Sequence, residues 1–178
     1  MAVEKKLSPL AISLLQPSDK NVNVLKKIHS QIFSSSYQEK FFTDSLECLP
    51  FTSMALYSDF AVAAICCRLE KLPSGKSTLY ISTLGVLSPY RGRGIGKKLL
   101  ANVMKLAKED QKIDEVYFHV PVNNAEATGF LKSCGFAVEG HRETIQGYTD
   151  NCDPVDCHVY VQSVSDWVAP EGVEIEEI

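Results

Sequence analysis

Apolar residues recur along this chain in two rhythms, one typical of helices and the other typical of strands. Apolar side chains spaced three and four residues apart predict helices over residues 20–33, 37–48, 95–110 and 124–134. Apolar runs bounded by turn residues predict strands over residues 8–16, 53–58, 60–71, 78–87, 115–120, 136–146 and 155–163. The order β-α-α-β-β-β-α-β-α-β-β predicts a domain that combines helices and strands.

A glycine-rich turn separates the predicted strand at 78–87 from the predicted helix at 95–110. It reads Ser88-Pro89-Tyr90-Arg91-Gly92-Arg93-Gly94-Ile95-Gly96-Lys97-Lys98. Glycines let the backbone turn sharply and present several N–H groups to one point, where the helix dipole adds partial positive charge. The same turn carries four cations, Arg91, Arg93, Lys97 and Lys98. It therefore predicts a binding site for an anion such as a phosphate group.

The spacing of these glycines excludes two common phosphate loops. A nucleoside-triphosphatase loop requires Ser or Thr after Gly96-Lys97 and a glycine at Arg91, and the chain has neither. A dinucleotide or kinase loop requires its third glycine at Lys97 or Leu99. What the chain does contain is the spacing Arg91-x-x-Gly94-x-Gly96. The structural alternative is a solvated turn that only begins a core helix.

Composition and charge narrow the class of protein. A chain of 178 residues, 45% hydrophobic and 22% charged, has the size of one domain that buries about 70% of its unfolded surface. Its net charge of -4 argues against binding duplex nucleic acid, which requires a basic face. No apolar run approaches the roughly 20 residues that span a bilayer, and the first residues lack an apolar signal core. We therefore expect a cytoplasmic protein without membrane contact.

The cysteines do not predict a disulfide framework or a metal site. Cys66 and Cys67 lie in an apolar strand-like run, which favours buried thiols. Cys152 and Cys157 have no second Cys/His pair at the spacing of a zinc finger. In a strand, moreover, Cys157 and His158 would point to opposite faces. We expect no metal.

The element order and the spacing Arg91-x-x-Gly94-x-Gly96 resemble those of the GCN5-related N-acetyltransferase (GNAT) superfamily, over residues 8–163. The resemblance implies an α/β (α+β) GNAT fold, in which a mixed central sheet splays between the fourth and fifth strands and about four helices flank it. It also implies acetyl-CoA as cosubstrate and a single domain over residues 1–165. We expect the acidic segment 166–178 to be a flexible tail.

Within this superfamily, the chain resembles the catalytic subunits of NatE-type protein N-terminal acetyltransferases. The resembling residues are Ile32-Phe33 with Tyr37, the segment from Leu79 to Arg91, Gly94-Ile95-Gly96, His119-Val120, Asn123-Asn124, Phe130, Gly135-Phe136 and Asp153-Pro154. The resemblance implies direct acetyl transfer, in a ternary complex, to the α-amine of a peptide or nascent-chain N-terminus that begins with methionine. It also implies partnership with a ribosome-associated N-terminal acetyltransferase complex, and a cytoplasmic and nuclear location.

The resemblance assigns proton removal to Tyr80 and His119, which would hold a water molecule near the amine. A tyrosine and a histidine on strands are also commonly packed, satisfied residues. A peptide α-amine has a pKa of about 7.7–8.0, against about 10.4 for lysine, so a modest proton acceptor suffices for an N-terminus. The leaving thiolate, with a pKa near 8.5, departs without full protonation. That matters because Leu131 stands where many superfamily members have a tyrosine acid.

The resemblance also implies a set of acetyl-CoA contacts. Those of the loop are Arg91, Gly92, Arg93, Gly94, Ile95, Gly96 and Lys97. Backbone N–H groups of Leu84, Gly85 and Val86, where the family's strand bulges, would polarise the acetyl carbonyl. Asn124 and Phe130 complete the set, although Asn124 is equally well explained as the cap of its helix.

The residues expected to contact the peptide are Phe33, Ser34, Ser35, Tyr37, Ser82 and Tyr148. The family's pocket loop usually reads Phe-Pro-Val, whereas Phe33-Ser34-Ser35 makes a looser and more polar wall. The family's paired tyrosines on the opposite wall are represented by Tyr148 alone. We therefore expect a weaker preference for methionine at the first residue.

The sequence leaves two alternative functions open. One is an acetyltransferase for lysine or a small amine, which would act on polyamines or internal lysines whether or not the peptide α-amine is blocked. The other is an acyl-CoA-binding scaffold that has lost most catalysis, which Leu131 and Ser34-Ser35 favour.

Overall fold

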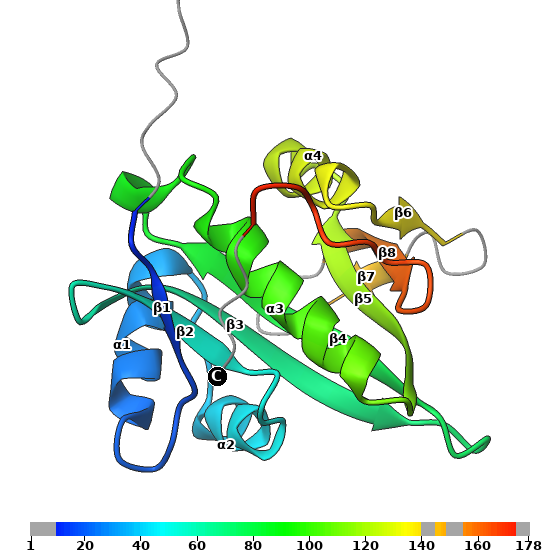
Figure 1. Ribbon diagram of the computed structural model, residues 1–178, viewed down its shortest axis with the longest axis horizontal. Helices are drawn as coiled ribbons and strands as arrows, with labels where there is room; N and C mark the ends of the chain where they lie inside the picture. Colours follow the sequence, from blue (N-terminus) through cyan, green and yellow to red (C-terminus); the bar gives the residue numbers. More distant parts are fainter. Residues whose placement is uncertain (1–9, 140–144, 149–154, 174–178) are drawn as a thin grey trace, which may run out of the picture.

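The computed structural model describes residues 10–139, 145–148 and 155–173, and a mixed β-sheet runs through the middle of the molecule (Figure 1). Its described strands are β1 (Ser13–Leu15), β2 (Ser53–Tyr57), β3 (Phe60–Lys71), β4 (Ser77–Val86), β5 (Ile113–Pro121), β6 (Ala137–Val138), β7 (Ile145–Tyr148) and β8 (Val155–Ser163). They are ordered β1-β2-β3-β4-β5-β8-β6, and β7 also pairs with β8. The pair β4–β5 is parallel, whereas the other pairs are antiparallel.

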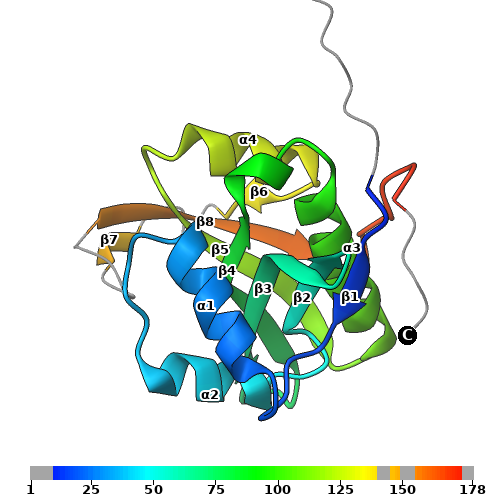
Figure 2. The same ribbon diagram turned by 90° about the vertical axis from the view of Figure 1, so that its left-hand side faces the viewer.

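Helices cover both faces of the sheet (Figure 2). They are α1 (Val22–Ile32), α2 (Glu39–Glu47), α3 (Ile95–Glu109) and α4 (Ala125–Ser133), with a 3-10 turn η1 at Ser88–Tyr90. α1 and α2 pack on the face of β2 and β3 that carries Met54, Ala64 and Cys66. α3 and α4 contribute to the larger core on the other face. The expected arrangement of helices around a mixed sheet is confirmed.

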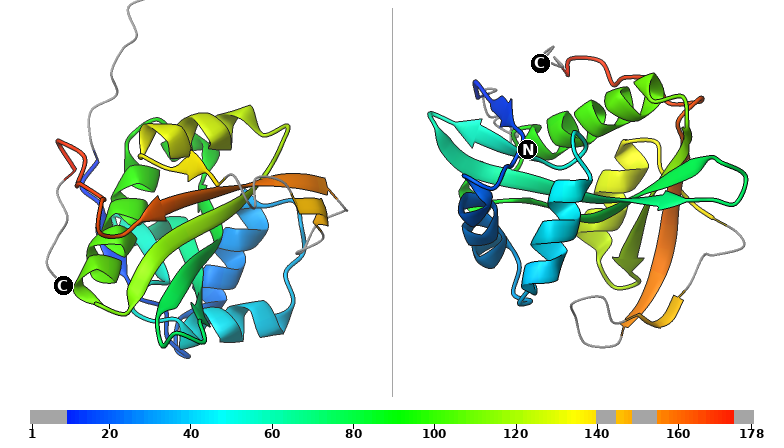
Figure 3. Two further views of the ribbon diagram at one scale, coloured as in Figure 1. Left: turned by 90° about the vertical axis from the view of Figure 1, so that its right-hand side faces the viewer. Right: turned by 90° about the horizontal axis from the view of Figure 1, so that it is seen from below.

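The sheet splays between β4 and β5, as expected. The two strands are paired only from Ser77 with Ile113 to Tyr80 with Tyr117. Beyond that point β5 remains paired with β8 as far as Pro121, on the side away from β4 (Figure 3). Among the described strands, the edge of β4 that faces β5 therefore has no partner after Tyr80, and its N–H groups can bind another molecule.

The bulge in β4 lies earlier than expected. Cys66 pairs with Thr83 and Cys67 with Ile81, so Ser82 is the extra residue. The expectation of a bulge at Leu84-Gly85-Val86 was wrong, since Gly85 pairs regularly with Ala64. Glycine at this position has another cause, described below.

Two expected strands match the described residues only in part. The first strand is limited to Ser13–Leu15 among the described residues. Of the predicted strand 136–146, the structure describes β6 and the start of β7, and both pair with β8. Residues 140–144 lie outside the described part, so a strand there stays a prediction.

The chain after β8 packs against α3. Trp167 is buried in the main core, and its carbonyl oxygen accepts a hydrogen bond from Nζ of Lys108 at 3.0 Å. The first part of the segment expected to be a flexible tail is therefore fixed by packing. The domain boundary at residue 165 stays a prediction, and residues 174–178 lie outside the described part.

Candidate active site

Three rings meet at the point where β4 and β5 part. Tyr80 is the last residue of β4 that pairs with β5, opposite Tyr117, and His119 lies two residues further along β5. The ring centroids of Tyr80 and His119 are 4.9 Å apart, and Tyr80 stacks on Tyr117 at 5.0 Å. Tyr80 and Tyr117 are buried, whereas His119 is half-buried. The fold thus brings together the two side chains that the sequence predicted as a catalytic pair.

A charged network that the sequence analysis missed borders this cluster. The guanidinium of Arg68 lies 4.9 Å from the centroid of the Tyr80 ring, and Arg68 donates a hydrogen bond to Glu70 at 3.0 Å. The other carboxylate oxygen of Glu70 accepts from the hydroxyl of Tyr117 at 2.6 Å. Burial and the Glu70 carboxylate raise the pKa of Tyr117 well above its usual value, so this phenol stays protonated. Arg68 and Glu70 have one possible signal in the sequence, their i, i+2 spacing on a strand.

The glycine-rich loop forms an open turn before α3. Gly92 and Gly94 have φ angles of 72° and 79°, in the left-handed region that favours glycine. A Cβ atom at either position would meet no atom within 4 Å, so the space above both is open. Arg91 donates from Nε to the carbonyl of Val86 at 3.0 Å, which fixes the loop to the end of β4. The first N–H groups of α3 lack helical acceptors, as at any helix start, and such groups are suited to binding an anion.

α4 covers the same end of α3. The side-chain oxygen of Asn124 accepts a hydrogen bond from the backbone N–H of Ala127 at 3.0 Å, so the predicted cap is confirmed. The ring of Phe130 lies 3.4 Å from the position that a Cβ atom at Gly96 would take. Leu131 is buried in the main core. Cofactor contacts of Asn124 and Phe130 stay a prediction.

Two of the expected peptide residues, Phe33 and Tyr37, pack together after the end of α1, and Phe33 lies next to β4. A Cβ atom at Gly85 would overlap Ile32 and lie 2.8 Å from Cζ of Phe33, so glycine is needed here because the end of α1 packs on β4. Tyr37 makes an edge contact with Phe33 at a centroid distance of 5.9 Å. Ser34 is exposed and Ser35 is half-buried. The backbone of Tyr148 belongs to β7, but its side chain lies outside the described part.

A buried histidine, His29, lies behind Phe33 and was not predicted. It is 1% exposed, on the apolar face of α1 with Leu25 and Ile28. Its Nδ1 is 3.1 Å from the carbonyl oxygen of Leu25, and its Nε2 is 2.8 Å from Oγ1 of Thr83. Burial lowers the pKa of His29 to about 4. A histidine within the apolar repeat of the helix was the signal that could have found it.

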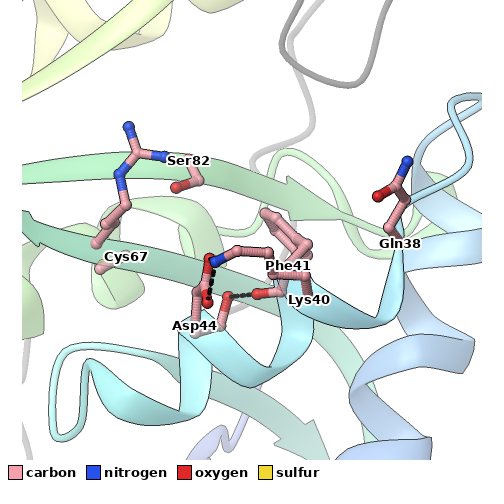
Figure 4. Close-up of a pocket in the computed structure, with 8 residues that line it drawn as sticks. Gln38, Lys40, Phe41, Asp44, Cys67 and Ser82 are labelled. Carbon is pink, nitrogen blue, oxygen red and sulfur yellow. Dashed lines mark hydrogen bonds and ion pairs between the residues drawn. The ribbon is translucent and has the colours of Figure 1, made fainter.

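A pocket of about 170 Å³ opens between α2 and strands β3 and β4 (Figure 4). Its lining residues are Gln38, Lys40, Phe41, Asp44, Ser45, Cys67, Arg68 and Ser82. In the close-up, Lys40 turns back to Asp44 on its own helix, where an ion pair of 2.6 Å joins the two. The pocket places the bulge residue Ser82 and the residue stacked on Tyr80, Arg68, on a shared wall. It therefore borders the cluster of Tyr80, Tyr117 and His119.

The described residues contain no group of three or more metal-ligating side chains. The five cysteines of the described part, Cys48, Cys66, Cys67, Cys134 and Cys157, form no disulfide. Burial raises the pKa of Cys66 to about 12. Cys152 lies outside the described residues. None of the helices in the described part of the chain is long and apolar enough to cross a membrane.

Comparison with known proteins gives consistent results. Residues 22–136 match the acetyltransferase (GNAT) family. The N-alpha-acetyltransferase 50 of Danio rerio is 37% identical over 157 residues, which cover 88% of this chain and 91% of that protein. The probable N-acetyltransferase san of Drosophila melanogaster is 37% identical over 149 residues, 84% of this chain and 79% of that protein.

Solved structures support the same grouping. Arabidopsis thaliana Naa50, in complex with the bisubstrate analogue CoA-Ac-MVNAL, superposes with a TM-score of 0.78 at 42% identity, covering 86% of this chain and 99% of that one. Arabidopsis thaliana NAA60 in complex with acetyl-CoA superposes with a TM-score of 0.74 at 22% identity, over 86% and 99% of the two chains. This second likeness concerns the fold alone.

Proposed function

We propose, since the chain belongs to the acetyltransferase (GNAT) family, that it transfers acetyl from acetyl-CoA to the α-amino group of protein N-termini. The relatives at 37–42% identity carry the names of N-terminal acetyltransferases, and one of them binds a conjugate of CoA with a methionine-starting peptide. Methionine-starting N-termini are therefore the first substrates to test.

The observation that carries the proposal is the pair Tyr80–His119 at the splay. The rings are 4.9 Å apart and lie where β5 leaves β4. A thioester from one side and an amine from the other can meet there. Proximity of this kind supplies a large part of the rate of an acyl transfer between two bound substrates.

Proton removal in this proposal is the task of Tyr80 and His119. About a tenth of a peptide α-amine is already neutral at pH 7, because its pKa is about 7.7–8.0. The pair would hold a water molecule that accepts the remaining proton as the amine attacks. The hydrogen-bonded Tyr117 keeps its proton, so it supports the cluster by packing rather than as a base.

Polarisation of the acetyl carbonyl is the task of the β4 edge. β5 pairs with β4 only as far as Tyr80, which leaves the edge of Leu84, Gly85 and Val86 available on that side. N–H groups there can donate to the oxygen as negative charge develops. The thiolate of CoA, with a pKa near 8.5, leaves without an acid at Leu131.

The finer parts of the proposal concern partners and location. The resemblance to NatE-type catalytic subunits supports assembly with a ribosome-associated N-terminal acetyltransferase complex, in the cytoplasm and the nucleus. The expected domain over residues 1–165 would carry the whole site. A scaffold that binds acyl-CoA with little turnover is the second candidate, because Leu131, which stands where many superfamily members have a tyrosine acid, is buried in the core.

A peptide array tests the proposed function. Purified protein and acetyl-CoA are incubated with peptides that have a free α-amine and an internal lysine, and matched peptides carry a blocked α-amine. We expect acetylation of the free α-amine, located by mass spectrometry, and none of the blocked peptides. Modification of lysine in both sets would support the lysine acetyltransferase. CoA binding without any product would support the scaffold.

A further inference from the structure

His29 links the helix that leads into the peptide pocket with the strand that carries the acetyl site. It lies on α1, one turn before the chain enters Phe33-Ser34-Ser35, and its Nε2 reaches Thr83 on β4. Four aromatic rings surround the imidazole, those of Phe33, Tyr37, Phe41 and Phe42, at centroid distances of 5.2 to 5.6 Å. The expected peptide pocket is thus built around this side chain.

The hydrogen bonds of His29 determine its protonation state. The carbonyl oxygen of Leu25 can only accept, so Nδ1 must carry the proton and donate to it. In the neutral ring Nε2 is then an acceptor, and the hydroxyl of Thr83 donates to it. The titratable groups that face the ring are Cys66 of β3, whose Sγ is 3.7 Å from Nε2, and Tyr37. A lowered pKa, about 4, agrees with this neutral form.

Both bonds together fix the ring against rotation and translation. The bond to Leu25 holds the ring to its own helix, and the bond to Thr83 holds that helix to the residue beside the bulge in β4. Phe33 is then confined between His29 on one side and Gly85 on the other. A shift of His29 would therefore move Phe33.

We propose that His29, held by Thr83, is a positioning residue that sets the first-residue preference of the peptide pocket. The proposal rests on the proposed function, because it concerns the α-amine substrate. His29 touches neither reacting atom and acts through Phe33 and Tyr37. An apolar pocket discriminates between side chains that differ by one methylene by only roughly 10- to 200-fold. A small displacement of Phe33 is therefore enough to change the first-residue preference.

Conservative variants of Thr83 test this role with little risk to the fold. Thr83→Val keeps the shape and removes the donor, whereas Thr83→Ser keeps the donor. We expect Thr83→Val to raise the peptide KM about fivefold and to reduce the preference for methionine over alanine, with acetyl-CoA affinity unchanged. Thr83→Ser should keep both the peptide KM and the preference for methionine close to their wild-type values. Val103→Ala, on the buried face of α3, is the stability control that should leave the preference intact.

A second variant tests the histidine itself. His29→Phe fills the same space without either hydrogen bond, and adding Thr83→Val to it should cause no further loss of preference, because the shared bond is already gone. An unchanged preference in Thr83→Val, or full additivity of the two changes, overturns this proposal alone. A wild-type protein that acetylates no α-amine overturns the proposed function and this proposal with it.

Discussion

The two sides of the splay are built from different parts of the polypeptide. The proposed cofactor side, formed by the end of β4, the loop and α3, depends on backbone: two glycines at φ angles of 72° and 79° and the first N–H groups of a helix. The proposed peptide side, formed by α1, α2 and the face of β4, depends on side chains, chiefly rings around the buried His29. A site made of backbone is visible in glycine spacing, whereas a site made of side chains depends on which residues the fold brings together.

The catalytic pair joins these two sides, and its loss should have the largest effect. We expect His119→Ala and Tyr80→Phe each to lower kcat by about a hundredfold or more, while acetyl-CoA affinity changes little. Their effects should be less than additive because both act on one proton. Single-turnover kinetics and calorimetry on the single and double variants measure this. Wild-type turnover in His119→Ala would remove the pair from the mechanism.

Acid should destabilise the fold through the buried His29 of the peptide side. Burial lowers the pKa of His29 from 6.5 to about 4. Between these two pH values, therefore, His29 binds a proton in the unfolded chain but not in the folded chain. The contribution of His29 to the free energy of unfolding is therefore fully present above pH 6.5. It is lost as the pH falls toward 4, which lowers the free energy of unfolding by about 3 kcal/mol. His29→Phe should reduce this pH-dependent loss. Urea unfolding at pH 7 and pH 4.5 measures the free energy of unfolding of the wild type and of His29→Phe. An equal decrease between the two pH values in both proteins would contradict this prediction.

A change in the loop should affect the cofactor side alone. Gly94→Val places a β-branched residue at a φ of 79°, in the space where a pyrophosphate would lie, and we expect acetyl-CoA affinity to fall about tenfold or more. Gly75→Val is a matched control, because Gly75 has a φ of 83° and equally open surroundings in the turn between β3 and β4. Calorimetry compares the two. Equal acetyl-CoA affinity in both variants would show that the loop does not contribute to cofactor binding.

A change in the pocket loop should affect the peptide side alone, and by the smallest amount. Ser34→Pro with Ser35→Val restores a rigid apolar wall, and we expect it to sharpen the preference for methionine a few-fold, mainly through KM. Comparison of kcat/KM for peptides that start with methionine, alanine and serine measures this. The same selectivity in both proteins would show that this loop does not set the first-residue choice.

The fold was largely predictable because its elements have regular apolar periods. The helices at 20–33 and 95–110 and the splay after Tyr80 were found, since each follows from local pattern or from the resemblance. The bulge was assigned to Gly85, but that glycine instead accommodates the close approach of α1. Sequence spacing alone does not distinguish these two uses of glycine.

The candidate site was less predictable where its contacts are long-range. His29 and Thr83 are 54 positions apart, and Tyr117 and Glu70 are 47 apart, so no local pattern reports either bond. Tyr80 and His119 were found by resemblance to a family motif. Their catalytic roles stay predictions, as do the cofactor and peptide contacts assigned with them.

In the proposed function, the cofactor side and the peptide side open into one site at the splay. A conjugate of CoA, acetyl and a methionine-starting peptide tests it, with binding measured by calorimetry beside acetyl-CoA alone. We predict that the conjugate binds about a hundredfold more tightly than acetyl-CoA, because both sides are engaged at once, and that Phe33→Ala removes most of this gain. Equal dissociation constants for the conjugate and acetyl-CoA would contradict the account.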